Sequence, residues 1–323
     1  AWAADIPSPI GLIAEPLVID GVVYLSAPFS VVHALDATTG ESLWSYDPEV
    51  DPGVSGGSSI ASRFNRGVAV WKGLVIVGTG DCRLVAIDAS TGKKVWDKPG
   101  CDPLNGSQIG GGSGITGAPL VADDKIFVGY LGSEAGARGS VAGFDAATGE
   151  QLWRFWTVPG DPSGPMKGME TKELEMAAKT WPNGWAEYGA GGVWDAVHYD
   201  PVTGFVIFGT GSPIPHALDQ RGEGDTLFAN SVIAVDANTG EYKWHYQTVP
   251  LDAWDYDATM PKIVTDVEID GKKRRVVFES GKSGFFYVLD ARTGDLLSAD
   301  AIATVSWASH VDLETGRPVT LPD

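Results

Sequence analysis

The sequence predicts an all-β fold, a β-propeller of four-stranded antiparallel blades in which tryptophans dock one blade onto the next. The first observation is a phrase of the form Asp-Ala-x-Thr-Gly, which recurs five times in the 323 residues. The second is a pair of strand-like segments ahead of the copies, and the third is the scatter of 42 Gly and 20 Pro along the chain. Scattered breakers of this kind separate many short strands and do not form low-complexity tracts.

The copies of the phrase are spaced like the blades of a propeller. They occupy residues 34–44, 86–96, 143–153, 234–244 and 288–298. Their aspartates lie 52, 57, 91 and 54 residues apart, and a period of about 50 with four strands per unit is typical of a blade. The longest interval holds about 35 residues more than a blade needs, and we expect a loop and helix insertion at about 160–192. Residues 171–180 are its helix candidate, because Gly-Pro and Pro-Asn-Gly breakers bound them.

The residue types of the phrase predict a tight turn between two strands. In the first copy Asp36 ends a strand, and its carboxylate can accept hydrogen bonds from the amides of the turn. Gly40 is free to adopt a positive φ. The next strand carries Trp44, which we expect to pack against the neighbouring blade. Hairpin signals precede the copies, as at 16–25, 67–78 and 118–129, and they complete the four strands of each unit.

Charge and composition exclude several classes of partner. The net charge of −19 argues against nucleic acid and anionic membrane, because both need a basic surface. A cationic protein partner is compatible with this charge, although solubility is a simpler explanation. No apolar run approaches the roughly 20 residues of a membrane span. No charged segment followed by an apolar run begins at Ala1, so we expect that any secretion signal was removed or lies outside this chain.

The two cysteines flank the second copy of the phrase. Cys82 and Cys101 both lie in predicted loops, and we expect a disulfide between them, which would add about 3 kcal/mol by the chain-entropy model. The alternative of a zinc site is disfavoured, because the five histidines show no ligand spacing near them.

One acidic stretch, residues 250–259, stands out after the fourth copy. Asp255 and Asp257 lie two residues apart between aromatic residues. If the stretch is extended, both carboxylates point to the same side. Two like charges held that close need a cation, or one of them gains a proton. The alternative is that both are solvated loop acids.

The chain resembles a known family, the pyrroloquinoline quinone (PQQ)-dependent alcohol dehydrogenases, which include the methanol dehydrogenases. The resemblance adds to the repeat several motifs in the family's order over essentially the whole chain. They include Asn65-Arg66-Gly67, Thr116-Gly-Ala-Pro119, Gly191-Gly-Val-Trp194-Asp195, Trp254-Asp-Tyr-Asp257 and Gly281-Lys282-Ser-Gly284.

The resemblance implies an eight-bladed propeller with the quinone at the mouth of its central channel. This chain would supply about five or six of those blades as one partial propeller domain, residues 1–323. Glu134 and Asp255 match the carboxylates around the metal, and Asp255 also matches the general base. Asp257 matches the added carboxylate of family members that use a lanthanide in place of calcium, and Ser212 occupies the position of a further metal ligand.

The resemblance also assigns the residues around the quinone. Trp194 matches the indole beneath the quinone ring, Arg66 and Thr116 match contacts of its carboxylates, and Lys282 matches the cation beside its reactive oxygens. The implied reaction is oxidation of an alcohol to an aldehyde or ketone by hydride transfer to metal-bound PQQ. The implied electron acceptor is a cytochrome c, and the implied compartment is the periplasm.

The chain departs from the family at several positions. Ile60-Ala61 replaces an adjacent cysteine pair, Ser212 an asparagine ligand, Ile13 a glutamate and Gly192 a threonine. Because the family continues beyond the residue that matches the end of this chain, we expect a longer protein. Two alternatives stay open, a propeller scaffold that binds a protein partner without catalysis and a degenerate quinoprotein. The carboxylates, Trp194 and Lys282 argue against the scaffold.

Overall fold

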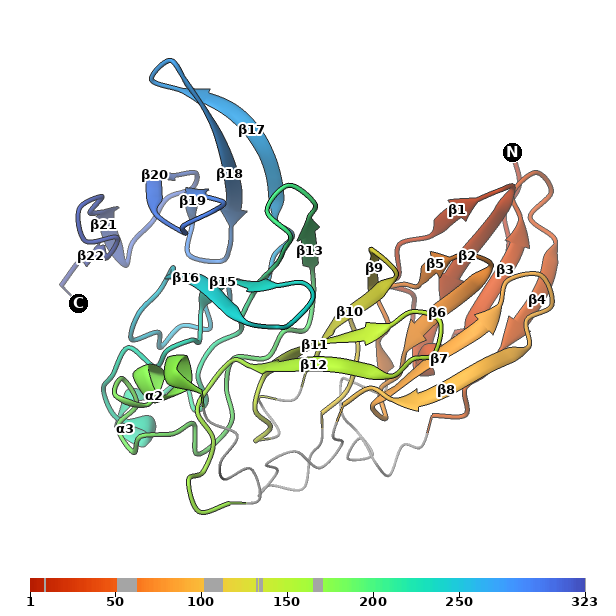
Figure 1. Ribbon diagram of the computed structural model, residues 1–323, viewed down its shortest axis with the longest axis horizontal. Helices are drawn as coiled ribbons and strands as arrows, with labels where there is room; N and C mark the ends of the chain where they lie inside the picture. Colours follow the sequence, from red (N-terminus) through yellow and green to blue (C-terminus); the bar gives the residue numbers. More distant parts are fainter. Residues whose placement is uncertain are drawn as a thin grey trace.

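The computed structural model describes residues 1–8, 10–50, 63–101, 113–131, 133, 136–164 and 171–322. In these residues the strands form five four-stranded sheets and one two-stranded sheet, each running in chain order. Figure 1 shows the sheets following one another around an arc from the N-terminus to the C-terminus. The prediction of an all-β protein with propeller blades is therefore confirmed.

Every strand pairs antiparallel with its neighbour in the sheet. The first three blades are β1 (Leu17–Ile19), β2 (Val22–Ser26), β3 (Val32–Asp36), β4 (Ser42–Tyr46); β5 (Ala69–Trp71), β6 (Leu74–Gly78), β7 (Arg83–Asp88), β8 (Lys94–Pro99); and β9 (Leu120–Ala122), β10 (Lys125–Gly129), β11 (Ser140–Asp145), β12 (Gln151–Trp156). The others are β13 (Val197–Asp200), β14 (Phe205–Gly209), β15 (Ser231–Asp236), β16 (Tyr242–Gln247); β17 (Ile263–Ile269), β18 (Lys272–Ser280), β19 (Phe285–Asp290), β20 (Leu296–Ala301); and the pair β21 (Ala308–Val311), β22 (Pro318–Thr320).

The helices are short and few in the described residues. They are η1 (Pro28–Ser30), α2 (Lys172–Ala178) and α3 (Leu218–Arg221). The α2 helix lies inside the predicted range 171–180, so the helix expected between the third and fourth blades is confirmed. None of the helices in this part of the chain is long and apolar enough to cross a membrane.

The repeated phrase forms the turn that its residues predict. Asp36 accepts hydrogen bonds at Oδ1 from the backbone amides of Thr38 and Thr39, both at 2.8 Å. Gly40 has a φ of 79°. A sixth turn of the same kind joins β21 and β22, where Asp312 accepts from the amides of Glu314 and Thr315 and precedes Gly316. This sixth turn was not among the five copies predicted.

Each tryptophan at the end of a copy docks onto the turn of the following copy. Trp44 donates from Nε1 to the carbonyl oxygen of Ala89 at 2.9 Å, and its ring lies against Gly92. A Cβ added to Gly92 would approach Trp44 Cγ to 2.8 Å, so the glycine leaves room for the ring. The same contact joins Trp153 to the turn at Gly240 and Trp244 to the turn at Gly294. These contacts confirm the expected docking of one blade onto the next.

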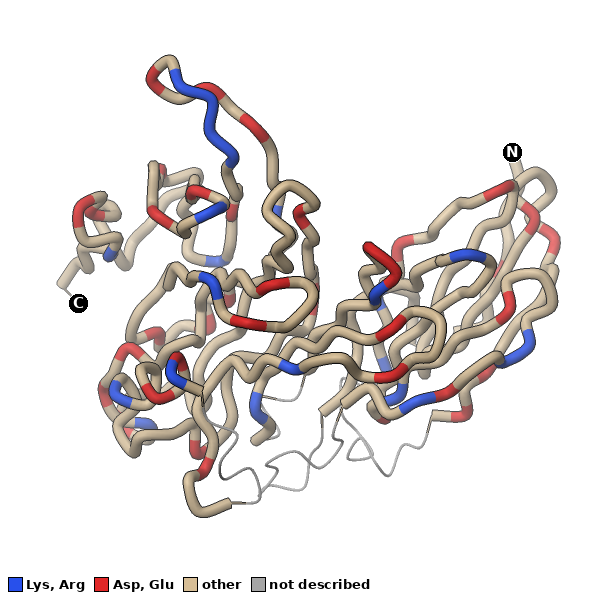
Figure 2. Tube along the Cα trace, viewed as in Figure 1, with Lys and Arg blue, Asp and Glu red and all other residues tan. Residues whose placement is uncertain are grey.

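The core lies in layers between neighbouring blades. In the fourth and fifth blades, for example, Ile207, Trp244, Val277 and Tyr287 belong to one buried cluster. Figure 2 shows acidic residues at many of the turns at the edges of the blades. Much of the negative charge therefore lies on the turns, and the clusters between the sheets are mainly apolar.

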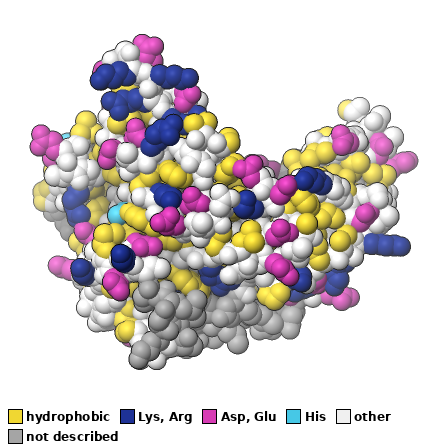
Figure 3. Space-filling view, in the orientation of Figure 1, with side chains coloured by type: hydrophobic (Ala, Val, Ile, Leu, Met, Phe, Trp, Pro, Cys, Tyr) yellow, Lys and Arg dark blue, Asp and Glu magenta, His cyan; other side chains and the backbone are white. Residues whose placement is uncertain are grey.

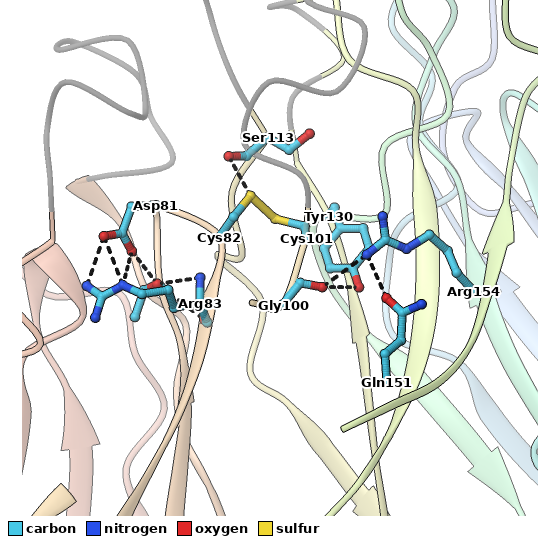
Figure 4. Close-up of a disulfide and its surroundings, with 10 residues drawn as sticks. Asp81, Cys82, Arg83, Gly100, Cys101, Ser113, Tyr130, Gln151 and Arg154 are labelled. Atoms are coloured by element: carbon cyan, nitrogen blue, oxygen red, sulfur yellow. Dashed lines mark hydrogen bonds and ion pairs between the residues drawn. A yellow bond between two sulfur atoms is a disulfide. The ribbon is translucent and has the colours of Figure 1, made fainter. Parts of the chain in front are cut away.

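The predicted disulfide between Cys82 and Cys101 is present. It joins the turn after β6 to the segment after β8, and Cys82 Sγ lies 3.0 Å from the carbonyl oxygen of Ser113 (Figure 4). The carbonyl of Gly100 next to it accepts a hydrogen bond from the Tyr130 hydroxyl at 2.7 Å. The disulfide thus links the second blade to the segment that enters the third.

We predict that Trp244→Ala lowers the free energy of unfolding by about 3–5 kcal/mol, because it empties a buried indole site and removes a hydrogen bond between blades. Urea unfolding followed by circular dichroism measures the loss. Leu43→Ala is the control, since Leu43 is 51% exposed, and it should change stability by less than about 0.5 kcal/mol. Equal effects of the two substitutions would contradict the docking role of the tryptophan.

Candidate active site

Three residues expected around the quinone lie in contact at the start of the second, third and fourth blades. Arg66 donates from Nη1 to Thr116 Oγ1 at 2.8 Å, and its guanidinium carbon lies 4.9 Å from the centre of the Trp194 ring. The Thr116 hydroxyl in turn donates to the carbonyl oxygen of Trp194 at 3.3 Å. Burial lowers the pKa of Arg66, and the charge of Asp195 opposes this shift. A partly buried guanidinium over an indole offers donors to an anionic, planar group.

The acidic pair meets a hydroxyl and an ammonium group. Ser212 Oγ donates to Asp255 Oδ1 at 3.2 Å and to Asp257 Oδ1 at 3.0 Å. Lys282 Nζ binds the other oxygens, Asp255 Oδ2 at 2.9 Å and Asp257 Oδ2 at 2.6 Å. The expected convergence of the two carboxylates is therefore confirmed, and the chain itself supplies a cation between them. Burial alone would lower the Lys282 pKa, but the hydrogen bonds and charges of both aspartates raise it.

The backbone conformation that brings the two carboxylates together differs from the extended one that was expected. Asp255 has a φ of 66°, in the left-handed region, so the stretch is not extended and that premise was wrong. A buried side chain, Asp252, shapes the loop by accepting hydrogen bonds from the amides of Trp254 at 2.9 Å and Tyr256 at 3.0 Å. Asn230 Nδ2 holds the same carboxylate at 2.7 Å.

The two carboxylates differ in exposure. The Asp255 side chain is 49% exposed, whereas that of Asp257 is 8% exposed. Asp255 Oδ1 also lies 3.5 Å from His216 Nε2. Asp257 is held from the inside, because the backbone amide of Ser212 donates to its Oδ1 at 2.8 Å. Asp255 can thus reach a molecule from solvent, while Asp257 is fixed in the wall of the site.

The residues expected around the quinone and the acidic pair are connected through the backbone. Gly211, next to Ser212, donates its amide hydrogen to the carbonyl oxygen of Gly192 at 2.8 Å. Gly192 lies two residues before Trp194, so the expected floor and the acidic pair belong to one connected region. A Cβ added to Gly211 would lie 3.1 Å from Asp257 Oδ1, which favours glycine at this position.

A cavity of about 430 Å³ lies beside this region. Its lining includes Ile13, Arg66, Pro119, Asp195 and Pro261. Ile13 stands where the family resemblance has a glutamate, and it faces the same cavity as Arg66. Figure 3 shows that the molecular surface is concave between the β17–β18 hairpin and the first blade.

Two expectations fall on residues that the structure does not describe. Glu134 and the pair Ile60-Ala61 lie outside the described ranges. Among the residues that are described, no group of three or more His, Cys, Asp or Glu side chains could hold a metal ion. The described part of the expected metal site therefore consists of Ser212, Asp255 and Asp257.

Sequence reasoning missed the residues that support the acidic loop from behind. Asp252 lies inside the acidic stretch, but its role was not predicted. The sequence does carry a signal for this role, because an aspartate often accepts a hydrogen bond from the backbone amide two residues after it. Asn230 and His216 are brought to the loop only by the fold, and no local pattern marks them.

The chain is similar to known quinoprotein dehydrogenases. The family profile described as glucose/ethanol/alcohol dehydrogenase, beta-propeller domain, matches residues 3–301. The quinohemoprotein alcohol dehydrogenase ADH-IIG of Pseudomonas putida is 46% identical over 99% of this chain and 44% of its own length. The lupanine 17-hydroxylase [cytochrome c] of a Pseudomonas species is 43% identical over 99% of this chain and 46% of its own length.

Solved structures give the same picture. The structure of ADHIIG from Pseudomonas putida HK5 superimposes with a TM-score of 0.89, covering 98% of this chain and 45% of that one. A europium-containing methanol dehydrogenase superimposes with a TM-score of 0.82 at 33% identity, covering 95% of this chain and 54% of that one. The chain thus spans about half the length of the relatives it matches.

We predict that Asp252→Asn lowers the free energy of unfolding by about 2–3 kcal/mol. The NH₂ group of the new asparagine cannot accept the two buried hydrogen bonds that Asp252 Oδ2 accepts from Asn230 Nδ2 and the Tyr256 amide. Asp312→Asn is the matched control: its carboxylate accepts from two amides in the same manner on an exposed turn, and the expected loss is below about 1 kcal/mol. Urea unfolding of the two variants checks the difference, and equal losses would contradict the supporting role of Asp252.

Proposed function

Because the chain belongs to the PQQ-dependent glucose, ethanol and alcohol dehydrogenase family, whose profile covers residues 3–301, we propose that it oxidises an alcohol to an aldehyde or ketone. The observation that carries this proposal is the unequal exposure of two carboxylates that share one hydroxyl and one ammonium group. Asp255 is half exposed, and Asp257 is almost fully buried. Asp255 can therefore exchange a proton with a substrate, while Asp257 serves as a fixed ligand.

Asp255 is the proposed general base. Its carboxylate takes the proton of the alcohol hydroxyl, and a hydrogen-bonded base in reach of that proton is what this step needs. A bound quinone would supply the acceptor for the hydride of the carbinol carbon, and a hard cation would supply the polarisation that this transfer needs. Lys282 already donates to Asp255 Oδ2 and holds the carboxylate in one orientation. Its ammonium group also adds positive charge next to the reacting atoms.

The residues at the proposed quinone site fit a planar polyanion. The Arg66 guanidinium and the Thr116 hydroxyl supply donors for carboxylates. The Trp194 indole supplies an aromatic face against which a ring can stack. Arg66 now lies over this indole at 4.9 Å, so we propose that it moves aside or stacks at the edge when the quinone binds.

The donor types at the acidic pair fit a hard cation, calcium or a lanthanide. Ser212, Asp255 and Asp257 offer only oxygen atoms, which these ions prefer. Glu134 would add a further carboxylate. Asp257 contributes a formal negative charge beyond that of Asp255, and by charge alone this favours a trivalent ion. Lys282, which donates to both aspartates, would supply a hydrogen-bond donor and a positive charge beside such an ion.

We propose a cytochrome c as electron acceptor and the periplasm as location. The relative whose name includes cytochrome c supports the first proposal. The disulfide between Cys82 and Cys101 supports the second, because such bonds persist in oxidising compartments such as the periplasm. The negative charge of the chain suits a cationic cytochrome.

Reconstitution of the whole protein with PQQ and either Ca²⁺ or La³⁺ should give alcohol-dependent reduction of a dye. In this assay we predict that Asp255→Asn lowers kcat by about 10²–10⁴-fold, because the base is lost. Asp219→Asn, on the exposed α3 helix, is the control and should keep full activity. A reconstituted wild-type protein inactive with both metals would reject the enzyme and favour the propeller scaffold or a degenerate quinoprotein.

We predict that Asp257→Ala abolishes activity with La³⁺ before activity with Ca²⁺, since it removes the charge that favours a trivalent ion. The measurement is the ratio of dye-reduction rates with the two metals over a range of metal concentrations. The ratio should fall by about tenfold or more for a charge effect of the size expected at a partly buried site. An unchanged metal preference would count against this role of Asp257.

A further inference from the structure

A fully buried ion pair lies behind the acidic loop. Lys262 Nζ lies 2.6 Å from Glu279 Oε2, and both side chains have no exposed surface. The same ammonium group donates to the carbonyl oxygens of Ala258 at 2.7 Å and of Met260. Its three hydrogens thus all have partners, and two of these partners are main-chain atoms of the loop. The chain from Asp257 to Lys262 turns around this ammonium group.

The main chain next to Asp257 is enclosed on two further sides. A Cβ added to Gly209, the last residue of β14, would lie 1.5 Å from the carbonyl oxygen of Ala258. A Cβ added to Gly281, just after β18, would lie 3.0 Å from the carbonyl oxygen of Asp257. The amide of Ala258 donates to the carbonyl of Thr210 at 3.1 Å. Two blades therefore confine this backbone, and Lys262 binds the Ala258 carbonyl that lies against Gly209.

Stability alone is a weak reason for such a pair. Burial raises the pKa of Glu279 and lowers that of Lys262, since both charged forms lose water, and their mutual attraction opposes both shifts. Apolar side chains of similar size often give equal or greater stability than a buried ion pair. A lysine that also binds two carbonyls of one loop has a task that an apolar side chain cannot perform, which is to fix that loop.

We propose that Lys262 is a positioning residue that holds Asp257 in place through the carbonyl of Ala258, and so sets the affinity of the acidic pair for a trivalent cation. Glu279 holds the Lys262 side chain in its buried position. The first part of this inference concerns the backbone alone, whereas the cation affinity rests on the proposed function. Asp255 and Asp257 repel each other. Lys282 binds both carboxylates on the side of the site, whereas Lys262 holds the backbone behind Asp257.

The test uses the whole protein without quinone and Tb³⁺ as the probe. Tb³⁺ luminescence excited through the nearby Trp254 reports binding, and hydrogen–deuterium exchange over residues 255–260 reports loop order. The double variant Lys262→Met/Glu279→Leu keeps the site filled with apolar groups and avoids a lone buried charge. We expect it to bind Tb³⁺ at least tenfold more weakly and to exchange faster in this segment. Glu279→Gln should keep most of the affinity, because the amide oxygen of glutamine can still accept a hydrogen bond from Nζ, which stays bound to both carbonyls.

The matched control is Arg275→Met/Asp200→Leu. It removes another largely buried ion pair of the fourth and fifth blades, in which Arg275 Nη2 lies 2.5 Å from Asp200 Oδ1. This control should lower stability and leave Tb³⁺ affinity and loop exchange unchanged. Equal Tb³⁺ affinity in wild type and the Lys262 double variant overturns the positioning role. If wild type binds no Tb³⁺, the proposed metal site fails, and unchanged exchange over 255–260 then overturns the role of Lys262 separately.

Discussion

The contact on which the structure depends is the one between each tryptophan and the glycine turn of the next repeat. Trp44 lies on Gly92, Trp96 on Gly149, Trp153 on Gly240 and Trp244 on Gly294. The indoles of Trp44, Trp153 and Trp244 also donate a hydrogen bond to a carbonyl of that turn. A directional hydrogen bond and a close ring contact fix the angle between blades more tightly than apolar packing alone. Because the contact repeats, each blade is placed relative to the one before it.

This repeated placement explains how residues far apart in sequence reach one site. Arg66, Thr116 and Trp194 lie three or four residues before β5, β9 and β13, the first strands of three successive blades. Ser212 and Lys282 lie two or three residues after β14 and β18, the second strands of two successive blades. Equivalent positions in adjacent blades face the same end of the propeller. These five residues thus come from two positions of the repeat, whereas Asp255 and Asp257 come from the loop between β16 and β17.

Much of this could be predicted from sequence, because the repeat encodes its own geometry. Asp36 and Gly40 specify a turn by local chemistry, and their spacing to Trp44 specifies the docking. The pairing of Cys82 with Cys101 followed from their places around one repeat. The support of the acidic loop could not be predicted, since Asn230 and Lys262 act on it across the fold. The left-handed backbone of Asp255 was missed because a pattern of alternating acids suggests an extended chain, whereas the buried carboxylate of Asp252 bends it.

Ser212 illustrates how a departure from a family pattern can leave the geometry intact. The Ser212 side chain is shorter than that of asparagine, so its hydroxyl oxygen would reach less far toward a metal ion. In this structure it has another task, since both its amide and its hydroxyl bind Asp257 Oδ1. The carboxylate of Asp257 then stands where it can contribute the charge that a longer neutral ligand cannot. A site with a short hydroxyl and an added carboxylate gains electrostatic attraction for a cation and loses one neutral oxygen. In the proposed function, the balance between the two depends on how firmly the backbone holds Asp257, so the buried contacts behind the loop would bear on the choice of metal.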